Sequence, residues 1–284
     1  MPGTKFLSMT RLEYTFKTDT LFKMLFVKNP DLLKQLVCDL LKIPINSISQ
    51  FEITNPEMPP EAMGEKFCRL DIYMIVGGQH VTLEIQVRDE KDYPDRVLFQ
   101  WARAYSNSLE SGGDYKNLPR TVIISIIDFL LLDCTEFHSE FRPLEVSRHE
   151  ELTDKMSLHF FELKKLSDDI NANNMLQLWL ALFKAETQEE LDKIKALEVA
   201  AMEKAINAYN TVTVSPEFRE LERLRSLARH NEASALRYAR DEGKLEERKK
   251  WQGVVANKES VISDKDAEIA RLKAQLESNN ALNC

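Results

Sequence analysis

The feature that most restricts the fold is a continuous apolar segment near the middle of the chain, RTVIISIIDFLLL at residues 120–132. Its residues are mostly β-branched or aliphatic, with almost no alternation between apolar and polar positions. A strand of this kind is buried on both faces, as in sheets that helices cover on both sides. We therefore expect the centre of a sheet within an α/β architecture.

Segments on either side of this run have helical or strand patterns. Residues 18–42 have apolar side chains at helical spacing, and Pro30-Asp31 predicts a break into two helices. Residues 93–110 predict another helix, and 159–166 predict another strand. Beyond these segments strand patterns almost vanish, and Thr213–Pro216 predicts a break between C-terminal helices.

Two short runs, FCRLDIYMIV and VTLEIQV, predict a β-hairpin that turns at Gly77-Gly78. A two-residue turn sets Asp71 opposite Glu84, with Cβ atoms about 4.5–5.5 Å apart. Gln86 shares their face because side chains alternate along a strand. Two carboxylates this close repel each other unless a cation lies between them, and such hard oxygen ligands suit Mg²⁺ or Mn²⁺. The alternative is an exposed hairpin face whose acids have no catalytic role.

Length, charge and cysteine usage restrict the class of protein. At 284 residues and 43% hydrophobic content, the chain can form one sizeable α/β domain plus an appendage. The N-terminus lacks a signal-peptide pattern and no apolar run has membrane-spanning length, so we expect a cytoplasmic protein. Four separated cysteines argue against a zinc site or a disulfide framework. With a net charge of −8, any contact with DNA must use a local basic patch helped by a metal.

The pattern Asp71-x12-Glu84-x-Gln86 resembles the acidic core of the PD-(D/E)XK nuclease superfamily, with Gln in place of the usual Lys. The segment TDTLFKMLF resembles the opening motif of the Rpn family, the recombination-promoting nucleases that are also described as transposases. The resemblance covers about 18–248, and its further matching segments are 95–129, 159–166 and 217–246. It implies the core fold of the superfamily, in agreement with the strand and helix patterns.

This resemblance also implies metal-dependent cleavage of a phosphodiester bond in DNA. Asp71 and Glu84 would bind the metal, and the backbone carbonyl of Ile85 would add a third ligand. Gln86 takes the place of the lysine that orients the attacking water, and it can form hydrogen bonds but has no charge. The family itself commonly has Gln at this position.

Three more residues have candidate roles. Asp19 matches the first acidic position of the family motif and would act on the metal through water; the alternative is a helix cap. Lys23, one turn later, would supply the positive charge that Gln86 lacks, or would simply pair with Asp19. Arg96, at the start of the helix after the hairpin, would contact a DNA phosphate, and the alternative is a solvated arginine.

The end of the chain has the seven-residue periodicity of a short coiled coil. Two lysines occupy positions of its second core series and weaken the pattern, so a solvated tail helix is the alternative. The apolar positions are Val255, Ile262, Ile269, Leu272 and Leu276, and the two lysines are Lys258 and Lys265.

We therefore predict a Mg²⁺-dependent DNA endonuclease that promotes recombination, with a possible setting in mobile elements or defence. The predicted fold has a central mixed sheet flanked by helices. A PD-(D/E)XK nuclease-like core at 10–170 is followed by a helical region at 171–250 and a coiled-coil tail at 251–284. DNA is the expected partner, with a second copy of the chain bound through the tail. Two alternatives stay open: a nuclease-derived protein that binds DNA or a partner without efficient cleavage, and a coiled-coil interaction module on a nuclease-like scaffold.

Overall fold

The computed structural model describes residues 10–55, 71–109 and 112–282. Contacts divide the chain into one compact unit of residues 1–223 and a second of residues 224–284. The longer helices and the strands are α1 (Asp19–Lys28), α2 (Pro30–Leu41), β1 (Phe51–Ile53), β2 (Ile72–Val76), β3 (Gln79–Gln86), α3 (Tyr93–Asn107), β4 (Thr121–Ile127), β5 (His138–Phe141), β6 (Met156–Glu162), α4 (Met175–Lys184), α5 (Gln188–Lys195), α6 (Ala200–Thr213) and α7 (Pro216–Leu282). Short 3-10 helices cover Ile45–Ser47, Tyr115–Asn117 and Leu163–Lys165.

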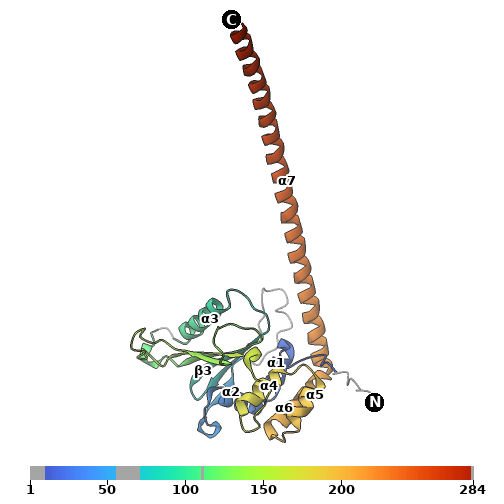
Figure 1. The fold of residues 1–284 in the computed structure, drawn as a ribbon. Coiled ribbons are helices and arrows are strands. Elements are labelled where there is room, and N and C mark those ends of the chain that lie inside the picture. Colours follow the sequence, from blue (N-terminus) through green and yellow to red (C-terminus); the bar gives the residue numbers. More distant parts are fainter. Residues whose placement is uncertain (1–9, 56–70, 110–111, 283–284) are drawn as a thin grey trace, which may run out of the picture. The chain divides into compact units, whose positions relative to one another are not determined.

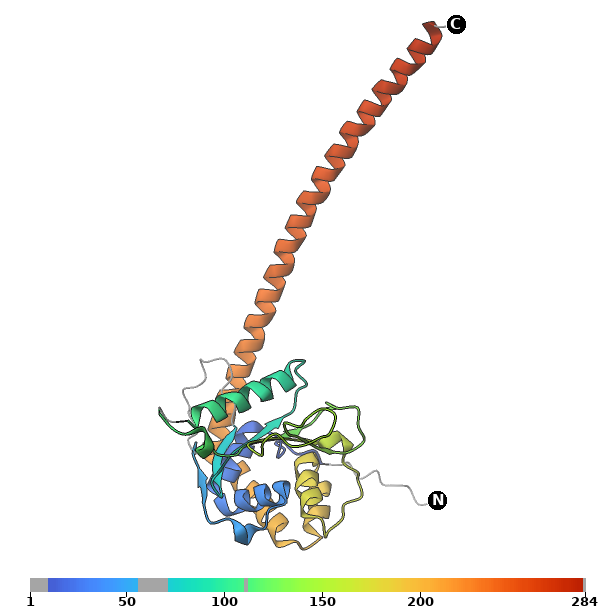
Figure 2. The same cartoon turned by 90° about the vertical axis from the view of Figure 1, so that its left-hand side faces the viewer.

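The six strands form one mixed sheet in the order β1-β2-β3-β4-β6-β5. Strand β4 runs parallel to both β3 and β6, and the other neighbours are antiparallel. Figures 1 and 2 show α3 on one face of the sheet and α1, α2, α4 and α6 on the other. The predicted α/β architecture with a central mixed sheet is therefore confirmed.

Strand β4 is the central strand that the apolar run predicts, and all seven of its residues are buried. Its two faces contribute to different cores. Ile123 and Ile127 pack with Tyr93 and Val97 of α3, whereas Ile124 and its neighbours on the opposite face belong to the larger core. A parallel strand with helices over both faces needs this continuous apolar composition.

The predicted hairpin is present with its predicted register. Gly77 and Gly78 both have positive φ, at 57° and 79°, as a tight two-residue turn requires. The ladder runs from Val76 paired with Gln79 to Ile72 paired with Leu83. One difference concerns Asp71, which precedes the first residue of β2 and does not lie in mid-strand.

Helix boundaries follow the local signals in the sequence. Asn29 separates α1 from α2, and Pro30 occupies the first turn of α2, where its missing N–H costs little. Thr18 is the N-cap residue of α1, although its side chain makes no capping hydrogen bond. The predicted break at Thr213–Pro216 separates α6 from α7.

Helices α4 to α6 pack into the same large core as α1, α2 and the sheet. Trp179 of α4 is fully buried, and its indole N–H donates a hydrogen bond of 2.7 Å to the Asp39 carboxylate on α2. Along the chain, the boundary between the two compact units lies between residues 223 and 224. The sequence predicts boundaries after residues 170 and 250.

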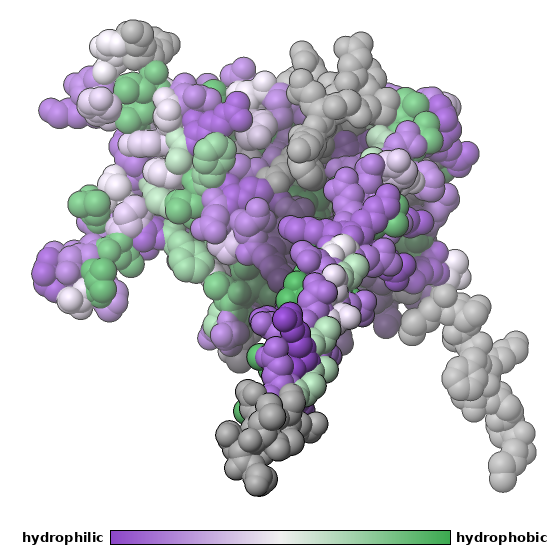
Figure 3. All heavy atoms as spheres, turned by 90° about the horizontal axis from the view of Figure 1, so that it is seen from above, coloured by the Kyte–Doolittle hydropathy of each residue, from purple (hydrophilic) through white to green (hydrophobic). Residues whose placement is uncertain are grey.

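The face of the molecule seen in Figure 3 is largely polar. In the view of Figure 3, hydrophilic side chains predominate and hydrophobic ones form small groups between them. Among the residues that the structure describes, no helix is both long enough and apolar enough to cross a membrane.

A partly buried polar cluster joins the edge strand β5 to β6. His138 and His159 lie 3.1 Å apart between Nε2 and Nδ1, and the Ser157 hydroxyl contacts both His159, at 2.8 Å, and Glu140, at 2.9 Å. Burial lowers the pKa of His159 to about 4; the charge of Glu140 opposes this shift, and the charges of His138, Arg120 and Arg142 add to it. Burial and the charge of Lys42 also lower the pKa of His138.

We expect this cluster to make the fold acid-sensitive. The unfolded His159 side chain takes up its proton near pH 6.5 and the folded one only near pH 4, so stability is lost as the pH falls through this window. The expected loss is about 2–3 kcal/mol between pH 7 and pH 4.5. Urea unfolding at both pH values, with His159→Gln for comparison, measures it. An equal pH dependence in both proteins would contradict the assignment.

Candidate active site

The two predicted acids lie on the face of the sheet that α3 covers. Continuing the β2–β3 register by one pair sets Asp71 opposite Glu84. Asp71 is 5% exposed and Glu84 is 2% exposed, so an exposed hairpin face is excluded. Buried carboxylates require hydrogen bonds or positive charge nearby, because desolvation penalises the ionised form.

Two hydroxyl groups from other elements hold the Glu84 carboxylate. Tyr93, the first residue of α3, donates a hydrogen bond of 2.6 Å to Oε1, and Ser125 of β4 donates one of 2.8 Å to the same oxygen. Ser125 is the residue of β4 that pairs with Glu84 in the parallel ladder. The sequence pattern of the hairpin indicates neither contact.

The pKa values of two tyrosines are raised at this site. Burial raises the pKa of Tyr73 to about 12, and the Asp71 and Glu84 carboxylates and a hydrogen bond to Asp71 add to the effect. Burial also raises the pKa of Tyr93 well above its ordinary value, again with the help of Glu84. Both phenols therefore stay protonated at neutral pH and can donate hydrogen bonds to carboxylates.

Gln86 and Arg96 lie in direct contact. The guanidinium Nη2 of Arg96 donates to Gln86 Oε1 at 3.1 Å, and the Gln86 amide donates to the backbone carbonyl of Arg88 at 2.8 Å. Arg96 also forms an ion pair with Glu90, and its guanidinium carbon lies 4.7 Å from the centre of the Tyr93 ring. The Arg96 side chain is 13% exposed, so it is not a freely solvated arginine.

The structure describes Asp19, Lys23 and Ile85 without testing their predicted roles. Asp19 is the first residue of α1, and Lys23, one turn later, is buried. Ile85 lies on β3 beyond the last described pair with β2, which is compatible with a ligand role for its carbonyl. The positive charge that the structure describes in contact with Gln86 is that of Arg96.

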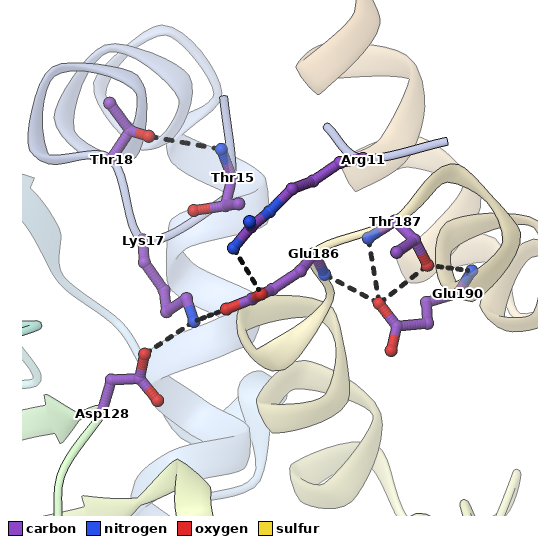
Figure 4. Close-up of polar contacts among 8 residues, drawn as sticks. All are labelled: Arg11, Thr15, Lys17, Thr18, Asp128, Glu186, Thr187 and Glu190. Carbon is purple, nitrogen blue, oxygen red and sulfur yellow. Dashed lines mark hydrogen bonds and ion pairs between the residues drawn. The ribbon is translucent and has the colours of Figure 1, made fainter. Parts of the chain in front are cut away.

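A second polar network supports the neighbouring end of β4. Figure 4 shows the Lys17 ammonium between the carboxylates of Asp128, at 2.7 Å, and Glu186, at 3.1 Å. The backbone N–H of Asp128 donates to the carbonyl of Gln86 at 3.0 Å. Lys17 thus joins the segment before α1 and the α4–α5 connection to the strand end beside Gln86.

The donor set fits a hard divalent cation. Among the described residues, no group of three or more His, Cys, Asp or Glu side chains could hold a metal ion by itself. Asp71 and Glu84 offer two carboxylates, so further oxygens would have to come from the backbone, water or substrate. Mg²⁺ commonly binds in this way, through one or two carboxylates with several waters and phosphate oxygens.

A mixed sheet with helices on both faces and a buried acidic pair at one end of the β2–β3 hairpin is consistent with a nuclease-like α/β fold. The sequence model described as PD-(D/E)XK nuclease family transposase matches residues 16–239, so the chain belongs to this family. This range includes every predicted site residue from Asp19 to Arg96. No curated protein and no solved structure gave a significant match. Family membership supports a nuclease- or transposase-like function.

Proposed function

We propose that this protein is a Mg²⁺- or Mn²⁺-dependent DNA endonuclease whose cuts promote recombination. The observation that supports this most is the acidic pair of Asp71 and Glu84, buried opposite each other at one end of the hairpin. A bound divalent cation would lower the pKa of a water and neutralise charge on the scissile phosphate.

Each site residue has a role in this proposal. Asp71, Glu84 and the carbonyl of Ile85 hold the cation, and Gln86 forms hydrogen bonds with the attacking water or the phosphate. Gln86 and the Tyr93 ring hold the guanidinium of Arg96 in place beside the site. From this position Arg96 contacts a phosphate oxygen. Asp19 and Lys23 of α1 keep their predicted supporting roles.

Incubation with supercoiled plasmid tests the proposal directly. We expect relaxed or linear DNA with Mg²⁺ or Mn²⁺ and intact plasmid with EDTA. Cleavage that is equally fast in EDTA would contradict the metal-dependent mechanism. A mobile-element or defence setting would require a separate assay in cells.

A nuclease-derived protein that binds DNA without cutting is the second candidate. It is favoured by Gln86, which replaces the usual lysine and whose amide oxygen and nitrogen already bond to Arg96 and the carbonyl of Arg88. DNA binding by gel shift, with no cleavage under any metal, would support this candidate.

The exposed apolar residues of the C-terminal helix α7 support the proposal that the protein forms a homodimer. All described side chains of α7 from residue 231 to 276 are exposed, including the apolar residues of the seven-residue pattern. Their exposed fractions run from 48% to 62%, for Val255, Ile262, Ile269, Leu272 and Leu276. Apolar positions at this spacing are buried when two helices supercoil.

We expect light scattering to give a mass approaching that of two chains for the full-length protein and the mass of one chain for a protein that ends at Lys250. Lys258 and Lys265 make the association modest, because they occupy positions of the second core series. The double substitution Ile262→Lys and Ile269→Lys should abolish this association. The matched control is Ser263→Lys and Ala270→Lys, one residue further along the same turns, which should leave the association unchanged. The same number of chains per particle in both proteins would refute dimerisation through the tail. Equal ratios of nicked to linear plasmid would refute its link to double-strand cleavage.

A further inference from the structure

Tyr93 contacts both the proposed metal ligand Glu84 and the proposed phosphate contact Arg96. Its hydroxyl donates 2.6 Å to Glu84 Oε1, and its ring lies under the guanidinium of Arg96 at 4.7 Å. The side chain is fully buried, with its ring edge-on to Phe129 at 5.5 Å and to Phe160 at 6.2 Å. Packing on several sides fixes where the hydroxyl points.

Ser125 provides a second, independent donor to the same carboxylate oxygen. It is fully buried on β4, and its hydroxyl lies 2.8 Å from Glu84 Oε1. Two donors on Oε1 fix the rotation of the carboxylate. The structure describes no hydrogen bond to the other oxygen, Oε2.

We propose that Tyr93 and Ser125 are positioning residues for metal binding, which hold Glu84 by Oε1 and present Oε2 to the cation. This inference rests on the proposed function, because it takes Glu84 as a metal ligand. Neither residue touches the reacting atoms. Partners that orient a ligand carboxylate commonly change metal affinity by about 10- to 100-fold when they are removed.

Tyr93→Phe separates the hydroxyl from the ring. The phenylalanine keeps the aromatic packing and the contact with Arg96 and removes only the hydrogen bond to Glu84. Ser125→Ala removes the other donor with a small change in volume. Tyr105→Phe is the matched control, since Tyr105 lies on the same helix and stacks on Trp101 at 5.0 Å.

The measurement is the Kd for Mn²⁺ of each metal-free protein, by calorimetry and by electron paramagnetic resonance, well below its Tm. We expect Tyr93→Phe and Ser125→Ala each to weaken Mn²⁺ binding by about 10- to 100-fold, with Tyr105→Phe unchanged. A lowered Tm with unchanged Mn²⁺ affinity in both site variants would show a purely structural role and overturn the inference. Wild-type protein that binds no Mn²⁺ would instead overturn the proposed metal site itself.

Discussion

Asp71→Asn and Glu84→Gln are each expected to reduce plasmid cleavage to the background rate. Each change removes the charge of one carboxylate ligand and keeps the shape of the side chain. The metal-free fold should stay intact or gain stability, because neutralising one acid relieves the repulsion between the pair. Cleavage rates with Mg²⁺, Mn²⁺ affinity and Tm of the same samples give the three readouts.

Glu52→Gln is the matched control for this prediction. Glu52 lies on β1, paired with Ile75 of β2, and its side chain is exposed. It should cleave at the wild-type rate. Normal cleavage by a folded Asp71→Asn protein would show that the acidic pair is not the active site.

Alanine is a poorer replacement for Glu84 than glutamine. Removing the whole carboxylate would leave the buried hydroxyls of Tyr93 and Ser125 without their acceptor, at a cost of about 1–3 kcal/mol for each unsatisfied group. The relief of repulsion expected from the hairpin alone is therefore offset in Glu84→Ala. This cost follows from contacts of Glu84 with α3 and β4, which the hairpin sequence alone does not indicate.

The sequence predicted those parts of the fold that depend on local signals. The Gly77-Gly78 turn fixes the hairpin register, and the register brings Asp71 and Glu84 together. The composition of 120–132 predicts β4 because a fully buried strand tolerates few polar residues. The short edge strands β1 and β5 were not predicted, since three or four residues of mixed polarity give no clear period.

The surroundings of the acidic pair depend on tertiary packing. Ser125 lies 41 residues after Glu84 in the chain, and only the parallel register of β3 and β4 brings them together. Tyr93 is fully buried. Its hydrogen bond to Glu84 follows from the way α3 crosses the sheet face, which no periodicity in residues 93–110 specifies.

Gln86 stands at the position of the usual lysine, so the proposed site needs another source of positive charge there. Its amide oxygen accepts a hydrogen bond from Arg96, so a positive charge lies beside the position that lysine occupies elsewhere in the superfamily. Glu90 balances that charge through its ion pair with Arg96. A hydrogen-bonding side chain at residue 86 can therefore orient both water and arginine, whereas an apolar one can orient neither.

We expect Gln86→Leu to lower kcat for DNA cleavage by on the order of 10²-fold or more with little change in KM, as for the loss of one transition-state donor. Gln86→Lys should retain or raise activity, since the ammonium donates hydrogen bonds and brings the positive charge of the usual lysine. Gln79→Leu, at the turn end of the same strand, is the matched control and should match the wild type. Equal rates for Gln86→Leu and the wild type would show that Gln86 has no part in catalysis, and would assign charge stabilisation to the proposed cation and the basic side chains of the site.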